Sequence, residues 1–224
     1  MLDRLELLIG KDSLNKIKKL NVVVLGLGGV GGFVAESLVR SGVCNITIVD
    51  NDTIDVTNLN RQIISNINNI GKLKTDEWEK RLLSINPDVS IKKISSFITE
   101  DNIDMLFEGN IDYFIDACDT IKTKELVIKK CIDNNIKSVT CLGTGKRLDS
   151  SKVCICDIRD TSYDPIAKKL RKFVKDNNIK EDVVCCCSKE EPKTVESTTI
   201  PSSIFVPGAA GIMISSYIIR DCLR

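Results

Sequence analysis

A glycine-rich turn between a strand and a helix constrains this chain more than any other feature of its sequence. The apolar run Val22–Leu25 leads directly into Gly-Leu-Gly-Gly-Val-Gly at positions 26–31, and a segment of helical period follows. This spacing lets the backbone approach a phosphate, whose charge the helix N-terminus then stabilises. Asp50 follows nineteen residues after Gly31 and can accept hydrogen bonds from both ribose hydroxyls. The pattern predicts a nucleotide site that fits either ATP or a dinucleotide.

Short β-branched runs alternate with amphipathic segments around this turn. The predicted strands are Val22–Leu25, Ile46–Val49, Val89–Ile94, Tyr113–Ile115 and Ser138–Cys141. The predicted helices between them are Gly32–Ser41, Leu73–Asn86 and Thr120–Asn134. Strand, helix and strand at this spacing produce right-handed crossovers. The fold class is therefore α/β, a Rossmann-like, mostly parallel sheet with helices on both faces.

The pattern changes after Gly143, where a C-terminal extension of strands is expected. Strand-like runs at Val153–Ile158 and Val183–Cys187 flank a basic helix at Pro165–Asp176, and an apolar segment from Gly208 should form a last helix. We expect one domain over residues 1–224, with a nucleotide-binding half at 1–142 and a substrate-facing half at 143–224. Residues 188–207 lack clear periodicity, which is typical of a functional or mobile segment.

Composition excludes several classes of function. Lys and Arg total 32 and Asp and Glu total 31, so a net charge of +1 provides no overall field to attract DNA or a membrane. The chain has no His, which excludes Ser-His-Asp and Cys-His catalysis and His-ligated zinc. No signal or membrane-spanning pattern is evident, and ten Cys at this length indicate reduced thiols. We expect a soluble, cytoplasmic protein.

Polar residues after the predicted strands favour ATP over a dinucleotide. Arg61 offers a fork of donors and Lys74 a point charge, and both suit a triphosphate. Asp119 follows the fourth predicted strand and could hold Mg²⁺. The chain also lacks a Tyr-x-x-x-Lys pair that would serve a dehydrogenase. A NAD-binding regulatory module remains the alternative from another class.

Together these motifs resemble the ATP site of the ubiquitin-activating-enzyme-like superfamily, which includes molybdopterin-synthase and thiamine-pathway adenylyltransferases. The resemblance implies that a carboxylate is adenylated with release of pyrophosphate, and that ATP and Mg²⁺ are the cofactors. An ionised carboxylate is already a nucleophile, so this chemistry requires no His. The residues that the resemblance places at the ATP are Gly26, Gly28, Gly29, Gly31, Asp50, Asp52, Thr57, Asn58, Arg61, Gln62, Lys74, Asp119 and Thr120.

The same resemblance implies roles for the charged residues. Arg61 and Lys74 would hold the phosphates, and Asp119 would assist metal or adenylate chemistry. Arg4 precedes Gly10 by six residues, where the superfamily has an arginine that reaches the phosphates of the neighbouring subunit. This implies a homodimer. The alternative for Arg4 is an ordinary solvated helix charge.

The basic helix at Pro165–Asp176 indicates which carboxylate is adenylated. Asp164 can cap it and Pro165 suits its first turn, and positive charges crowd the side opposite its apolar face, namely Lys168, Lys169, Arg171, Lys172 and Lys175. This segment and 188–192 resemble the tRNA threonylcarbamoyladenosine dehydratases. That resemblance implies ATP-dependent cyclisation of N6-threonylcarbamoyladenosine at tRNA position 37, with tRNA on the basic helix. A merely solvated helix is the alternative for these charges.

The cysteines leave two possibilities open. Carrier-activating members of the superfamily commonly hold zinc with two Cys-x-x-Cys pairs, and this chain has none. Cys154-Ile155-Cys156 and Cys185-Cys186-Cys187 have a different spacing, so we expect no structural metal, although four sulfurs could converge if their strands paired. Cys185 is a possible reactive thiol without an evident base. The alternative function is activation of a ubiquitin-like sulfur carrier, and a cysteine desulfurase or sulfur-acceptor system is a possible partner.

Overall fold

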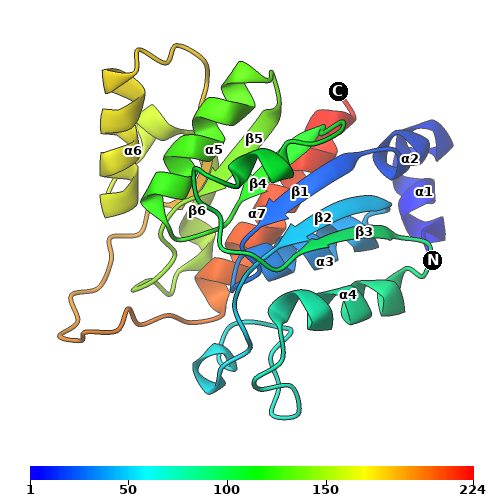
Figure 1. The fold of residues 1–224 in the computed structure, drawn as a ribbon, viewed down its shortest axis with the longest axis horizontal. Helices are drawn as coiled ribbons and strands as arrows, with labels where there is room; N and C mark the ends of the chain where they lie inside the picture. The colour runs from blue at the N-terminus through cyan, green and yellow to red at the C-terminus, as the bar shows by residue number, and fades with distance from the viewer.

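The computed structural model describes residues 1–224, which form a central sheet of seven strands (Figure 1). The strand order is β3-β2-β1-β4-β5-β7-β6. Neighbours run parallel except β6 and β7, which are antiparallel. The α/β fold with a mostly parallel sheet is confirmed. The strands are β1 (Asn21–Leu25), β2 (Asn45–Val49), β3 (Ser90–Ile94), β4 (Tyr113–Asp116), β5 (Lys137–Cys141), β6 (Val153–Asp157) and β7 (Val184–Ser188).

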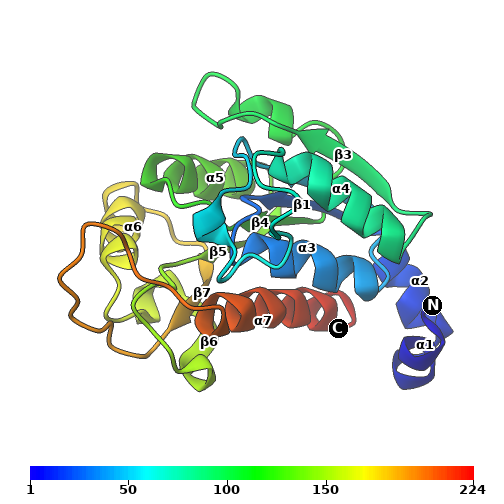
Figure 2. The ribbon, with the colours of Figure 1, turned by 90° about the horizontal axis from the view of Figure 1, so that it is seen from below.

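Helices cover both faces of the sheet. Figure 2 shows α3 and α7 side by side on one face and α5 with α6 on the other. α4 joins α3 and α7 in the largest apolar core, whereas α5 packs over a smaller core and α6 over a third one. The helices are α1 (Asp3–Ile9), α2 (Lys11–Lys18), α3 (Gly31–Arg40), α4 (Lys74–Ile85), α5 (Ile121–Asp133), α6 (Pro165–Asp176) and α7 (Phe205–Cys222), with short 3₁₀ turns η1 (Val56–Asn58), η2 (Ile103–Leu106), η3 (Ser150–Lys152) and η4 (Ile158–Asp160).

Two parts of the chain differ from the sequence expectation. The first nineteen residues form α1 and α2, which are not among the predicted helices. Leu5, Leu8 and Ile9 recur at helical spacing on α1, but the helix buries none of its residues. α7 begins at Phe205 rather than Gly208. Pro207 lies in its first turn, where a missing N–H costs no hydrogen bond. No helix of the structure combines the length and the apolarity that crossing a membrane requires.

A buried ion pair lies beneath the carboxyl end of β4. The Lys124 side chain of α5 is 0% exposed, and its Nζ lies 3.1 Å from Asp116 Oδ2 and 3.2 Å from Oδ1. Lys124 Nζ also donates to the Cys141 carbonyl at 2.8 Å, which ties α5 to β5. Burial is the largest single influence and by itself would lower the pKa of Lys124, but its interactions with neighbouring groups, chiefly the Asp116 carboxylate, together outweigh burial and the net shift is upward. The pair fixes the position of α5 behind the ends of two strands.

We expect Lys124→Met to lower the free energy of unfolding by about 3–5 kcal/mol, because it leaves the Asp116 carboxylate buried without a partner. The measurement is urea denaturation. Lys92→Met is the matched control, since Lys92 pairs with Glu108 at an exposed site, and it should cost less than about 1 kcal/mol. Equal losses in the two variants would contradict the argument.

Candidate functional site

A cavity of about 700 Å³ opens at the carboxyl ends of the parallel strands. Those ends meet at one edge of the sheet, so residues that are distant in sequence converge there. The lining contains most of the nucleotide-binding residues expected from the sequence: Gly26, Gly28, Gly29, Asp50, Asp52, Asn58, Arg61, Gln62, Lys74, Asp119 and Thr120. Thr57 and Gly31 are not part of the lining, and Gly31 is instead buried at the start of α3.

The glycine turn between β1 and α3 has no room for side chains at two positions. Gly26 has a φ of +87°, and a Cβ there would lie 2.8 Å from the backbone of Ala117. A Cβ on Gly31 would lie 1.7 Å from the carbonyl oxygen of Gly26. By contrast, a Cβ on Gly28 would meet nothing closer than Gln62 Nε2 at 3.8 Å. The turn therefore packs tightly against the protein and keeps open space on its cavity side.

Asp50 directly follows β2 and is held in place by the backbone. Its Oδ2 accepts from Leu27 N at 2.6 Å and its Oδ1 from Asp52 N at 2.8 Å. Burial raises the pKa of this carboxyl. A carboxylate has about four acceptor sites, so two remain for further donors such as ribose hydroxyls.

Lys74 is the first residue of α4 and is 4% exposed. Its Nζ lies 2.8 Å from Asp52 Oδ2 and 3.9 Å from Asp50 Oδ1. Two carboxylates therefore already surround this ammonium group at the cavity wall. Such a group can bind phosphate, but part of its charge is offset before any ligand arrives.

The η1 turn positions Arg61. Asn58 and Asp55 form a capping box in which Asp55 N donates to Asn58 Oδ1 at 3.1 Å, so buried Asn58 stabilises the turn. Thr57 lies on the outer side of this turn and bonds to Asp55. Arg61 Nη1 donates to the Thr57 carbonyl at 2.8 Å and to Asn60 Oδ1 at 3.0 Å. Both acceptors are neutral, so the charge of Arg61 is not offset by them.

Gln62 provides evidence that the cavity is built for a polar ligand. Its side chain is 6% exposed, it lines the cavity, and its Oε1 has no hydrogen-bond partner. An unpartnered buried amide oxygen costs about 1–3 kcal/mol. A bound donor, such as an amino group of a nucleotide base, would remove that cost.

The segment after β4 carries the exposed carboxylate of Asp119 and the unreactive thiol of Cys118. Asp119 lies three residues beyond the end of β4 and is an exposed carboxylate in the lining, suited to a hydrated cation. Cys118 also lines the cavity, and its thiol donates to Asp116 Oδ1 at 3.0 Å. Burial and the Asp116 charge raise the pKa of Cys118, so it is not a thiolate nucleophile.

Sequence reasoning missed the loop that follows β5. Residues 143–147 line the cavity, and buried Arg147 holds them by donating to the carbonyls of Gly143 at 2.8 Å, Tyr163 at 2.9 Å and Glu190 at 2.9 Å. Asp164 accepts from Gly143 N at 2.8 Å and caps α6 through Ile166 N at 2.7 Å. The sequence Gly-Thr-Gly-Lys, which begins two residues after the end of the predicted strand Ser138–Cys141, is the signal that could have found this loop.

Three groups of expected site residues lie elsewhere. Arg4 is exposed on α1 and does not line the cavity of its own chain. The basic residues of α6 are also outside the lining; Lys168, Lys169, Lys172 and Lys175 are exposed, whereas Arg171 is half-buried and bonds to Thr161. Cys185 is fully buried, and hydrogen bonding with Cys187 together with burial raises its pKa far above the usual value. It is therefore not a reactive thiol.

Comparisons with known proteins agree with this geometry. A model described as "ThiF family" matches residues 2–218. The tRNA threonylcarbamoyladenosine dehydratase of Bacillus subtilis is 36% identical over 99% of this chain and 94% of its own length. That of Haemophilus influenzae is 38% identical over 76% of this chain and 66% of its own length. The solved structure of the E. coli enzyme of that name in complex with ATP superposes with a TM-score of 0.93, at 29% identity over 99% of this chain and 93% of that one. The chain belongs to the ThiF family.

Proposed function

We propose that this chain is an ATP-dependent tRNA threonylcarbamoyladenosine dehydratase that closes the threonylcarbamoyl group of tRNA adenosine-37 into a ring. The observation that carries the proposal is the extent of the match, since similarity to a named dehydratase runs through 99% of the chain and includes the half that faces the substrate. We propose that residues 1–224 act as one adenylating domain, with ATP in the cavity at the strand ends.

The cavity residues support ATP as the ligand. Asp50 retains acceptor sites for ribose hydroxyls, the Gly28 side of the turn is open for phosphate, and Gln62 Oε1 lacks a donor. Arg61 and Lys74 supply positive charge beside that turn. Asp119 and Asp52 both line the cavity and carry the carboxylate oxygens that Mg²⁺ prefers as ligands.

The proposed chemistry proceeds without a proton shuttle. A carboxylate oxygen of the threonyl group attacks the α-phosphorus, the bond to the β-phosphate oxygen breaks, and pyrophosphate leaves. A group of the carbamoyl part of the same modification then attacks the acyl carbon, the acyl–phosphate bond breaks and AMP leaves. The N–H proton of the attacking carbamoyl group is released to solvent water, so that one water is lost from the modification overall. Orientation and cationic charge at the phosphates lower both barriers. Half-buried Cys118 takes no covalent part.

The exposed face of α6 is the proposed tRNA contact. Asp164 caps α6 and also accepts from the cavity loop, so the basic helix begins at the rim of the nucleotide site. Its exposed lysines, Lys168, Lys169, Lys172 and Lys175, form a local positive patch on a chain of net charge +1. Local cations are sufficient for contacts to RNA phosphates.

We propose a homodimer in which Arg4 completes the neighbouring site. Leu7 and Leu8 on the same short helix are 88% and 80% exposed, which is apolar surface suited to a subunit interface. We place the protein in the cytoplasm, where its tRNA substrate is found.

The direct test uses ATP, Mg²⁺ and tRNA that carries the threonylcarbamoyl group. We expect the digested nucleoside to lose the mass of one water, and this loss to require ATP. Unmodified tRNA is the control. If the same preparation binds ATP but the nucleoside mass does not change, this substrate is excluded. Adenylation of a Gly-Gly carrier protein in the same preparation would favour the sulfur-carrier alternative.

Arg61→Ala should reduce pyrophosphate release by about 100-fold or more, because an uncompensated cation at the phosphates is lost. Lys74→Ala should also reduce it, because the Asp50 and Asp52 carboxylates then lose the cation that offsets them beside the phosphates. Lys72→Ala is the matched control, since Lys72 is exposed, lies two residues from Lys74 and is outside the cavity lining. Pyrophosphate release at the wild-type rate in Arg61→Ala would remove Arg61 from the proposed mechanism.

Charge reversal at Lys168, Lys169 and Lys172 should weaken tRNA binding by about tenfold or more and reduce its dependence on salt. ATP binding should not change, because these side chains lie outside the cavity. The control reverses Lys16, Lys18 and Lys19, which are also exposed and lie on or directly after α2. Figure 1 shows α2 at the opposite end of the molecule from α6. If both triple variants bind tRNA alike, α6 is not the binding surface.

A further inference from the structure

Four cysteines lie on one face of the antiparallel pair β6–β7. The register sets Cys154 opposite Cys187 and Cys156 opposite Cys185. Side chains alternate across a strand, so these four share the face under α6, whereas Cys186 points into the main core on the other face. The two Cys-x-Cys segments therefore meet through strand pairing, although their spacing in the sequence matches no common zinc motif.

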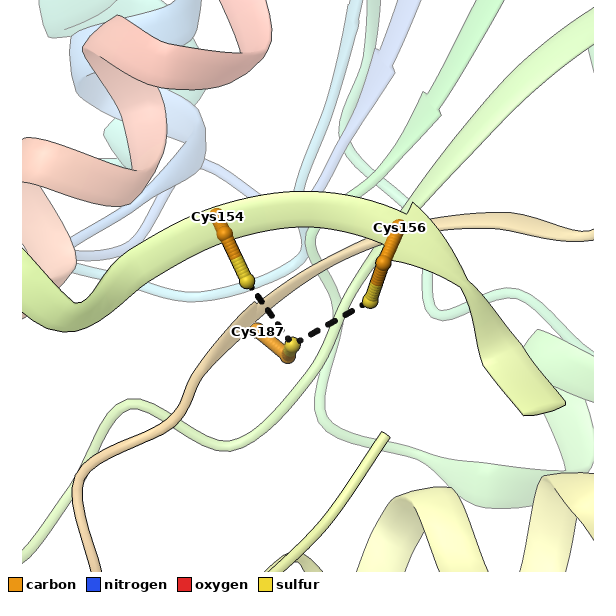
Figure 3. Close-up of side chains that lie close together, drawn as sticks. All are labelled: Cys154, Cys156 and Cys187. Carbon is orange, nitrogen blue, oxygen red and sulfur yellow. Dashed lines mark hydrogen bonds between the residues drawn. The ribbon is translucent and has the colours of Figure 1, made fainter. Parts of the chain in front are cut away.

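Three of the sulfurs converge closely. Cys187 Sγ lies 3.7 Å from Cys154 Sγ and 3.5 Å from Cys156 Sγ, and all three lie within 4.8 Å of one another (Figure 3). A tetrahedral ion with metal–sulfur bonds of about 2.3 Å holds its sulfurs about 3.8 Å apart. The trio therefore already has nearly the ligand separation of a thiolate metal site.

Core filling accounts for only part of this arrangement, since Cys154 and Cys156 pack against the core beneath α6 only in part. Cys187 is buried, but Cys154 and Cys156 are partly exposed, and a small apolar residue gains little by burial at such positions. The same exposure leaves the trio accessible from solvent. Cys185 is not part of the trio, because the sulfurs that all lie within 4.8 Å of one another are those of Cys154, Cys156 and Cys187. The Cys185 thiol instead donates to the Cys156 carbonyl at 3.3 Å.

We propose that Cys154, Cys156 and Cys187 bind one soft divalent cation, with Zn²⁺ as the representative, and that water occupies the fourth position. Each thiol that becomes a ligand releases its proton to solvent, and no oxidation occurs. β6 is an edge strand and pairs only with β7. An ion across the two strands would fix this edge of the sheet beneath α6. The proposal stands independently of the substrate that the enzyme uses.

The test loads the full chain with Zn²⁺ in the presence of a phosphine reductant, desalts it and measures the metal. We expect about one ion per chain in the wild type and less than about a tenth in Cys187→Ser and Cys154→Ser. The matched controls are Cys44→Ser and Cys222→Ser, which remove partly exposed cysteines elsewhere and should retain the wild-type content.

A second measurement needs no variant and so does not depend on the folding of the mutants. Co²⁺ added to the reduced wild-type chain should produce the absorption bands of thiolate coordination, and Zn²⁺ should displace them. Wild-type protein that retains no zinc and shows no such bands would overturn the proposal. Retention of zinc in a well-folded Cys187→Ser variant, as judged by circular dichroism, would also overturn it.

Discussion

The close contact inside the turn after β1 is the constraint on which the site depends. Gly26 and Gly31 approach so closely that a single Cβ at position 31 would overlap a carbonyl oxygen, and a Cβ at position 26 would overlap the backbone after β4. This contact sets how α3 leaves the sheet and brings the end of β4 against the turn. The space beside Gly28, the carboxylate of Asp50 and the residues after β4 are therefore placed around one cavity by backbone packing.

The sequence was sufficient to predict features that depend on local pattern. The first five strands, the helix between Pro165 and Asp176 and most of the cavity residues follow from periodicity and from the rule that strand ends converge. Lys124 could not be predicted, because a lysine within an amphipathic helix normally faces solvent and only the position of Asp116 buries it. The cysteine trio also depends on long-range register, since pairing of β6 with β7 is what joins residues 154 and 187.

The two halves of the chain are joined by hydrogen bonds to backbone groups. Arg147 reaches carbonyls from three separate segments, and Asp164 bonds both to the cavity loop and to the first turn of α6. Backbone acceptors leave no pattern in the side-chain sequence, which is why this connection was not anticipated. The connection gives the basic helix a fixed position relative to the nucleotide cavity. An enzyme that binds a large polyanion on one surface and carries out the reaction in a separate cavity requires such a fixed arrangement.

The cations of the cavity are not equivalent. Lys74 lies within 4 Å of two carboxylates, so a ligand phosphate would compete with Asp50 and Asp52 for its charge. Arg61 bonds only to a carbonyl and an amide oxygen, so its full charge is available. A triphosphate that enters the cavity would therefore meet Arg61 as an uncompensated cation and Lys74 as a group already oriented by its acidic neighbours. Arg61 and Lys74 can stabilise the phosphates in these two ways in a chain without His, because adenylation of a carboxylate requires stabilisation of phosphate charge rather than movement of a proton.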